Sequence, residues 1–287
     1  THLGLNAGFA TIYYLERDDT TFNSADGSVN FYHKITPRAT FANKSYLSYS
    51  IEPDLQIGVA VPRRLSHYYY GHNNASLTYA FNRRLSSITR VGVSGISYED
   101  ETSAASNDKF TYNISQEMRY VLNVVSDVVG EYRFITSDYD VADYDYGAHY
   151  LLAGLNRNFN LMLRGTLMAG VQKRSFDNGY EDDWQPHLET SLRYNVTEKT
   201  QLSWINRFGY EDGELASNKA TSRTGWNSSL NLSYSFTDRL RSNFGMTYHS
   251  YNFERPELIE LAEVMKTINL GVNYRLYSNI DLNAKYS

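Results

Sequence analysis

Basic side chains on the polar side of alternating segments are the first feature of this sequence that could do chemistry. Alternation places these on one side of a series of short segments: Lys34, Arg38, Lys44, Arg90, Arg119, Arg133, Arg164, Arg174, Arg193, Arg207, Arg223, Arg241, Arg275 and Lys285. Fewer acids share that side, namely Glu117, Glu131, Glu189, Asp281 and Glu211. Because a guanidinium binds carboxylate, sulfate or phosphate through parallel N–H donors, this excess predicts a passage that favours anions. The alternative for a single arginine is a structural ion pair, as Arg119 with Glu117 or Arg133 with Glu131.

The residues that catalysis would need are present but are not arranged for it. None of the 7 histidines falls in a Gly-x-Ser-x-Gly elbow or a His-x-x-x-His metal pair. His187 and Glu189 form the best acid–base pair, but any two residues that lie two apart on a strand share a face. The chain has no cysteine, which excludes disulfides and thiolate metal sites. We therefore predict no enzyme activity, no cofactor, no metal site and no nucleic-acid partner.

The elements that position the basic residues are β-strands, because apolar and polar residues alternate along them. In 223–236, for example, Leu230, Leu232 and Tyr234 oppose a face of serine and asparagine. The alternation predicts strands over 2–14, 28–51, 55–62, 72–81, 85–98, 109–122, 127–137, 144–155, 160–175, 184–196, 200–210, 223–236, 239–252, 264–276 and 279–287. The second range is long for a single strand and has a candidate break at Thr36-Pro37.

Short turns of one type separate many of these strands. They are predicted at Ile51–Asp54, Phe81–Arg84, Asn156–Phe159, Val196–Lys199, Phe236–Arg239 and Leu276–Asn279. The opposite ends of the strands are joined by longer, acidic loops at 16–19, 99–101, 138–145, 181–183, 211–214 and 254–263. Short turns on one side and long loops on the other are typical of outer-membrane β-barrels. The acidic loops are expected to be solvated, with divalent-cation binding as the alternative.

Composition decides which face of the strands meets lipid. No stretch approaches the roughly 18–20 apolar residues of a membrane helix, whereas a barrel strand needs only about 9–11 residues with half of them apolar. The low mean hydropathy of -0.51 is compatible with such strands, and the 26 tyrosines fit the aromatic girdles of barrels. A polar face of Ser, Thr, Asn and isolated Arg suits a wet lumen better than the surface of a soluble sandwich or β-solenoid.

The predicted fold is a single domain, 1–287, that is an all-β, transmembrane, antiparallel up-and-down barrel integral to the bacterial outer membrane. Fifteen strands are predicted, and about 16 strands are the size at which a barrel can leave an aqueous channel. Because the last alternating segment stops at Ser287, we expect about one and a half strands to be missing from this chain. The lipid bilayer and lipopolysaccharide are the expected surroundings.

Recurrent turn cassettes carry a resemblance to a known family. These are Tyr234-Ser-Phe-Thr-Asp-Arg-Leu240, Tyr194-Asn-Val-Thr-Glu-Lys-Thr200 and Tyr49-Ser-Ile-Glu-Pro-Asp-Leu55, together with the early segments Leu3–Phe9 and Ile35–Arg38. Over essentially its whole length the chain resembles the β-barrel porin family found in exopolysaccharide gene clusters. The resemblance implies export of a polysaccharide, fed to the barrel by periplasmic export proteins.

Three functions therefore compete at this stage. The first is export of an anionic exopolysaccharide through an Arg-lined lumen, with Tyr14, Tyr32 and Tyr46 placed to stack on sugar rings. The second is a general or anion-selective diffusion porin, in which the same lumen passes small anionic solutes. The third is a structural barrel subunit of a larger envelope complex.

Overall fold

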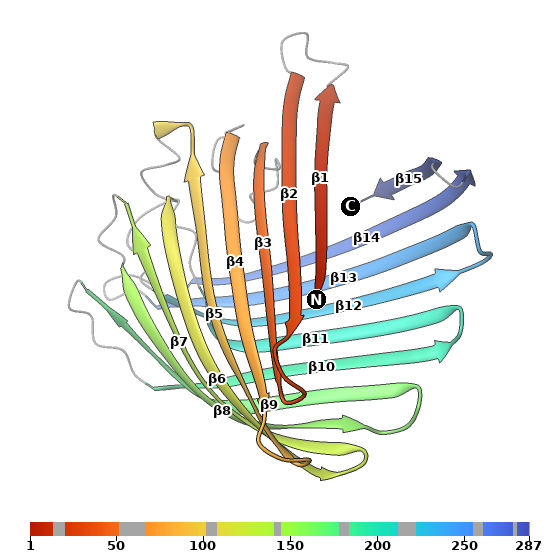
Figure 1. Cartoon of the computed structure of the whole chain (residues 1–287). Helices are drawn as coiled ribbons and strands as arrows, with labels where there is room; N and C mark the ends of the chain where they lie inside the picture. Colours follow the sequence, from red (N-terminus) through yellow and green to blue (C-terminus); the bar gives the residue numbers. More distant parts are fainter. Residues whose placement is uncertain are drawn as a thin grey trace.

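The computed structural model describes residues 1–13, 21–51, 67–101, 108–140, 145–177, 184–211, 222–254, 261–277 and 280–286. They form one antiparallel sheet of 15 strands, in which each strand pairs with the next in the sequence (Figure 1). The strands are β1 His2–Tyr13, β2 Thr21–Lys34, β3 Ala39–Ile51, β4 His67–Ala80, β5 Leu85–Tyr98, β6 Lys109–Asn123, β7 Ser126–Tyr139, β8 Tyr146–Asn158, β9 Leu163–Phe176, β10 Gln185–Thr197, β11 Thr200–Glu211, β12 Ser222–Ser235, β13 Leu240–Glu254, β14 Leu261–Tyr277 and β15 Ile280–Tyr286.

The sheet is curved into a trough, with β1–β5 in one wall and β11–β15 in the other (Figure 1). In the described part of the chain, no helix has the length and apolarity needed to cross a membrane. The predicted all-β, antiparallel up-and-down architecture is confirmed.

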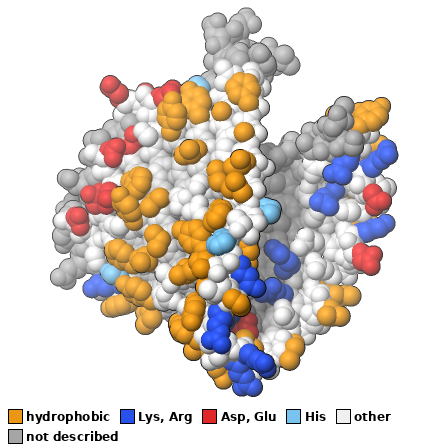
Figure 2. Space-filling model, in the orientation of Figure 1, with side chains coloured by type: hydrophobic (Ala, Val, Ile, Leu, Met, Phe, Trp, Pro, Cys, Tyr) orange, Lys and Arg blue, Asp and Glu red, His pale blue; other side chains and the backbone are white. Residues whose placement is uncertain are grey.

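The outer face of the sheet is apolar and exposed. Nearly all the large apolar side chains that the strands expose lie on this face by register, including Leu5 (68% exposed), Leu47 (70%) and Leu151 (61%). Figure 2 shows apolar side chains gathered over the outer surface of the β2–β7 wall. Exposed apolar area on this scale is costly in water, so this face is built for contact with lipid.

The inner face is polar except at one apolar cluster. The cluster lies where β7, β8 and β9 meet, and consists of the buried residues Val129, Tyr146, Ala148, Tyr150, Leu152, Met168 and Phe176. Buried polar residues surround it, among them Gln172 (1% exposed) and His187 (4%). The predicted polar lumen is thus interrupted by a packed patch on three neighbouring strands.

The short turns share one hydrogen-bonded design. In the β4–β5 turn, the amide N of Phe81 donates to the carbonyl of Leu85, and the side-chain oxygen of Asn82 accepts from the amides of Arg84 and Leu85 at 2.8 and 2.9 Å. Thr237 plays the same part in the β12–β13 turn. Asn and Thr are favoured here because a short polar side chain can satisfy backbone amides that the turn leaves unpaired.

The turn prediction at Asn156–Phe159 was wrong by three residues. Strand β8 continues to Asn158, and the turn runs from Phe159, with Asn160 accepting from the amides of Met162 and Leu163. Asn156 and Asn158 are turn-forming residues by type, but tertiary pairing with β9 keeps them in the strand. A short turn that is not among the six predicted ones joins β6 to β7, in the gap between the predicted strands 109–122 and 127–137, and there Asn123 accepts from the amide of Val125.

The strand prediction near the N-terminus needs one correction. The range 28–51 is two strands, β2 and β3, divided at the candidate break Thr36-Pro37 by a turn in which Thr36 accepts from the amides of Arg38 and Ala39. The range 55–62 lies outside the described residues, and in the described sheet β3 pairs directly with β4, with Ile51 opposite His67. Of the predicted turn Ile51–Asp54, only Ile51 is among the described residues. Strand β3 ends at Ile51, and this end of the strand is opposite to the short turn at Thr36, so it belongs to the long-loop end of the sheet. The described sheet has fifteen strands, which is the number predicted.

Candidate functional site: the polar inner face

The strand register places the predicted basic residues on one common face. Opposed residues of antiparallel strands point the same way, and the pairings connect the inner positions of every strand from β1 to β15. The positions on this face are those of Lys34, Lys44, Arg90, Arg119, Arg133, Arg164, Arg174, Arg193, Arg207, Arg223, Arg241, Arg275 and Lys285. Arg38 lies in the β2–β3 turn. Whether these residues line a conducting lumen stays a prediction.

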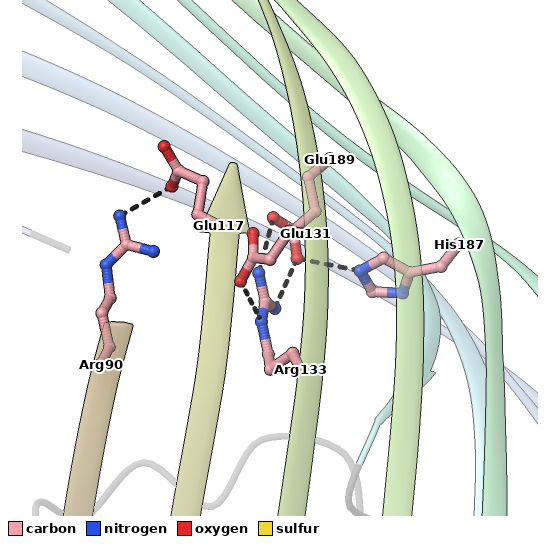
Figure 3. A network of polar contacts seen from close by, with 6 residues as sticks. All are labelled: Arg90, Glu117, Glu131, Arg133, His187 and Glu189. Atoms are coloured by element: carbon pink, nitrogen blue, oxygen red, sulfur yellow. Dashed lines mark hydrogen bonds and ion pairs between the residues drawn. The ribbon is translucent and has the colours of Figure 1, made fainter. Parts of the chain in front are cut away.

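An ion-pair network occupies the inner face of β5, β6, β7 and β10 (Figure 3). Glu117 takes one hydrogen bond from Arg90 at 2.7 Å and one from Arg119 at 2.8 Å. Arg133 donates to Glu131 at 3.0 Å and to Glu189 at 2.9 Å. Strands β7 and β10 are separated by β8 and β9, so this contact forms only because the face is concave.

The network neutralises the acids of this region. Glu117 and Glu131 stand directly opposite each other on β6 and β7, an unfavourable placement for two carboxylates unless cations lie between or beside them. Their side chains are only 8% and 10% exposed, which makes the arginine partners necessary. The structural ion pairs expected for Arg119 and Arg133 are therefore confirmed, and Arg90 joins them.

His187 belongs to this wall. Its Nε2 lies 2.9 Å from Glu189, its ring meets Tyr150 edge-on at 5.1 Å, and its side chain is 3% exposed. Because Arg133 also holds Glu189, the carboxylate of the predicted acid–base pair is already engaged. Among the described residues, no group of three His, Asp or Glu side chains is placed to hold a metal ion.

Arg164 and Arg193 differ from the network arginines. They stand directly opposite each other on β9 and β10, both exposed on the inner face near the short-turn end. Neither forms an ion pair with any acid that the structure describes. Like charges directly opposite each other on a sheet destabilise it, so this pair is better suited to an external anion than to bracing the wall.

A neutral polar groove of about 560 Å³ begins at Arg193 and crosses β11 to β14. Its inner-face lining is amide, hydroxyl or glycine: Gln201, Ser203, Asn231, Ser233, Asn243, Gly245, Asn269, Gly271 and Asn273. The glycines keep it open, since a side chain at Gly245 would meet the carboxamide of Asn231 at 3.2 Å. Amides and hydroxyls both donate and accept hydrogen bonds, so the groove matches hydroxyl-rich solutes.

Aromatic residues line the inner face of the opposite wall. The ring of Tyr46 stacks on His72 at 5.5 Å and lies 6.3 Å from Tyr70. Tyr32 also has an inner-face position and is 48% exposed. Tyr14, the third tyrosine proposed to stack on sugars, lies outside the described residues.

Sequence reasoning missed the groove, although it noted a face rich in Ser and Asn. A usable signal was present in the run Asn269-x-Gly271-x-Asn273, where small and amide residues recur at inner positions of β14. It also missed the contact between Arg133 and Glu189, which are far apart in the sequence and have no local signal.

These features define the class of the protein. An up-and-down antiparallel sheet with an apolar, exposed outer face and a polar inner face is the construction of an outer-membrane β-barrel. The chain is an integral β-barrel protein of the bacterial outer membrane.

Comparison with solved structures supports this fold. The chain is similar to the iron transporter FrpB of Neisseria meningitidis, F5-1 variant, with a TM-score of 0.53 and 8% identity over 89% of this chain and 51% of that one. The apoprotein form gives a TM-score of 0.51 and 9% identity over 95% and 54%. The siderophore receptor PirA of Pseudomonas aeruginosa gives 0.49 and 10% identity over 99% and 63%. The prediction that the chain is not an enzyme agrees with the printed name of the FrpB structures, which is iron transporter.

The chain spans between about half and two thirds of the length of these structures. No protein-family model and no curated protein matches the sequence. The resemblance to the porin family of exopolysaccharide gene clusters therefore stays a prediction.

Proposed function

We propose that the chain forms the wall of an outer-membrane passage through which an anionic polysaccharide is exported. The observation that carries this proposal is the position of Arg164 and Arg193, opposite each other without a carboxylate partner in the described chain, at the edge of the neutral polar groove. The arginines supply sites for acidic groups, and the groove supplies sites for hydroxyls.

The groove supports a sugar polymer over a small anion. A simple anion needs only the positive charge, whereas the groove offers a run of amides and hydroxyls over four strands, with no acid among its lining residues. Each hydrogen bond from the groove to a sugar hydroxyl replaces a hydrogen bond to water, so its net contribution to the binding free energy is small. A polysaccharide can therefore move from one group of the groove to the next without being held tightly at any of them.

Two other cargoes remain as outcomes of the test. A diffusion porin would use Arg164 and Arg193 to select small anions and would be indifferent to sugars. Iron, for which a ferric chelate serves as the probe, is the cargo suggested by the name of the FrpB iron transporters, which share the fold.

The test is single-channel conductance in planar bilayers, with the reversal potential measured in a salt gradient. We expect a small, anion-selective conductance that is blocked by an oligogalacturonate and only weakly by a neutral oligosaccharide of the same length. Exchange of both arginines, Arg164→Gln with Arg193→Gln, should weaken the block by about ten-fold, equivalent to ~1.4 kcal/mol.

The matched control is Arg83→Gln with Arg84→Gln, which removes the same two charges from the exposed β4–β5 turn. Equal block of the Arg164 and Arg193 double variant and the wild type would refute the role given to the arginine pair. A large, weakly selective conductance that ignores both oligosaccharides would favour a diffusion porin, and block by a ferric chelate alone would favour iron uptake. A complete lack of conductance would favour a structural barrel.

A further inference from the structure

An apolar groove of about 820 Å³ crosses the outer wall of the sheet from β2 to β6. The outer-face side chains that border it include Leu47, Tyr49, Tyr69, Val93 and Phe110. We propose that this groove binds an acyl chain of lipid A, the membrane anchor of lipopolysaccharide. The proposal concerns the lipid-facing surface and does not depend on what passes through the lumen.

Glycine forms the floor of the groove. Gly27, Gly71 and Gly95 occupy outer-face positions on β2, β4 and β5. Gly71 and Gly95 stand opposite each other, with Leu47 on β3 and Phe110 on β6 at their other sides. An added Cβ would meet the end of the Leu47 side chain at 2.8 Å at Gly71, and the Phe110 ring at 3.0 Å at Gly95. Those two side chains therefore lean over a backbone that has no side chain of its own, which leaves a hollow rather than a flat surface.

The position of the groove selects the leaflet. Tyr49 lies two residues from the end of β3, Tyr69 lies two residues after the start of β4, and Phe110 is the second residue of β6, all at the long-loop end of the sheet. Long loops of outer-membrane barrels are extracellular. The groove therefore opens to the outer leaflet, whose lipid is lipopolysaccharide.

A hydrogen-bonded aromatic pair holds the upper end of the groove in shape. The rings of Tyr49 and Tyr69 lie 4.9 Å apart, and both hydroxyls donate to the carboxylate of Glu99, at 3.4 and 3.2 Å. This arrangement places an apolar wall below a polar, exposed rim, which is the profile that an amphipathic lipid requires. The groove is continuous with the lipid-facing surface, so a lipid chain can enter it sideways.

A second outer-face groove provides a contrast. It has a volume of about 430 Å³ and is lined by residues near the short-turn end, among them Leu163, Leu192, Tyr194 and Leu202. Its position corresponds to the inner leaflet, where the lipids are phospholipids. The two grooves therefore make the leaflet assignment testable.

The test is native mass spectrometry of the protein, delipidated in detergent and titrated with hexa-acylated lipid A or with dioleoyl phosphatidylethanolamine. The wild type is expected to retain one lipid A in preference to the phospholipid. The variant Gly71→Leu with Gly95→Leu fills the groove and should weaken lipid A retention by about five-fold, equivalent to ~1 kcal/mol.

The matched control is Gly130→Leu. Gly130 is also an outer-face glycine, opposite Met118 and Ala153, but an added Cβ there meets no atom within 4 Å, and it does not line the groove. Its lipid A retention should equal that of the wild type. Heat-modifiable migration on a gel checks that each variant is folded.

If the double variant does not fold, Gly27→Leu takes its place, because its Cβ meets only the carbonyl of Asn6 at 3.9 Å. Equal lipid A retention by the filled and control variants would overturn the proposal. A loss of phosphatidylethanolamine retention in the filled variant as large as its loss of lipid A retention would overturn the choice of lipid.

Discussion

Arg133→Met is the substitution that most directly tests the interpretation of the inner wall. Arg133 is the cation that joins β7 to β10, with Nε on Glu131 at 3.0 Å and one terminal nitrogen on Glu189 at 2.9 Å. Methionine keeps much of the side-chain volume and removes the charge. The change leaves two carboxylates on the inner face without the cation that connects them.

The expected cost follows from the burial of these carboxylates. Removing one partner of a buried ion pair costs about 3–5 kcal/mol, because the other charge is left without compensation. Glu131 is 10% exposed but Glu189 is 29% exposed, so water relieves part of the penalty at the second site. The free energy of unfolding should therefore fall by ~2–3 kcal/mol.

The assay is equilibrium unfolding in guanidinium chloride from lipid vesicles, followed by fluorescence of the 3 tryptophans. Arg193→Met is the control, since Arg193 forms no ion pair among the described residues and faces Arg164. Its free energy of unfolding should stay level or rise, because the substitution removes a like-charge pair. A loss for Arg133→Met no greater than that for Arg193→Met would refute the claim that the network stabilises the wall.

Two further substitutions test the facing of the strands and the packing at β11. Leu151→Arg puts a charge on the outer face of β8, near the middle of the strand, and should cost ~2–4 kcal/mol, whereas Asn269→Arg on the inner face of β14 should cost less than ~1 kcal/mol in the same unfolding assay. Gly209→Ala should cost ~1–3 kcal/mol, because Gly209 has a φ of 153° and its added Cβ would collide with the imidazole of His187. Its penalty should shrink in a His187→Ala background, and an unchanged penalty there would show that the collision is not the cause.

Local pattern determined most of the strands and their faces. A strand turns alternate side chains to opposite sides, so residue spacing alone assigned Arg90, Arg164 and Arg275 to a common face, as the register has them. The turn at Phe81–Arg84 was also readable, because Asn82 satisfies nearby backbone amides with its own side chain.

Residue alternation and turn composition gave wrong predictions where the same local sequence is compatible with two backbone structures. Alternation runs through 28–51 on both sides of the candidate break at Thr36-Pro37, and the pairing of β2 with β3 shows that the chain reverses there. Asn156-Arg157-Asn158 has the composition of a turn, but its backbone groups are paired across the sheet with β9. Local preference is a weak force compared with a continuous ladder of hydrogen bonds between neighbouring strands.

The chemistry of the site depended on register and curvature, which no single strand contains. The sequence by itself determined that basic residues face inward and that apolar residues face lipid. Only the tertiary structure decided that Arg133 reaches Glu189 across two intervening strands, while Arg164 meets Arg193 and no acid in the described chain. Pairing brings residues together from distant strands, and the bend of the sheet sets how far a side chain can reach across its concave face. Strand register and sheet curvature therefore determine whether an inner-face arginine forms an ion pair within the wall or stays available to bind an external anion.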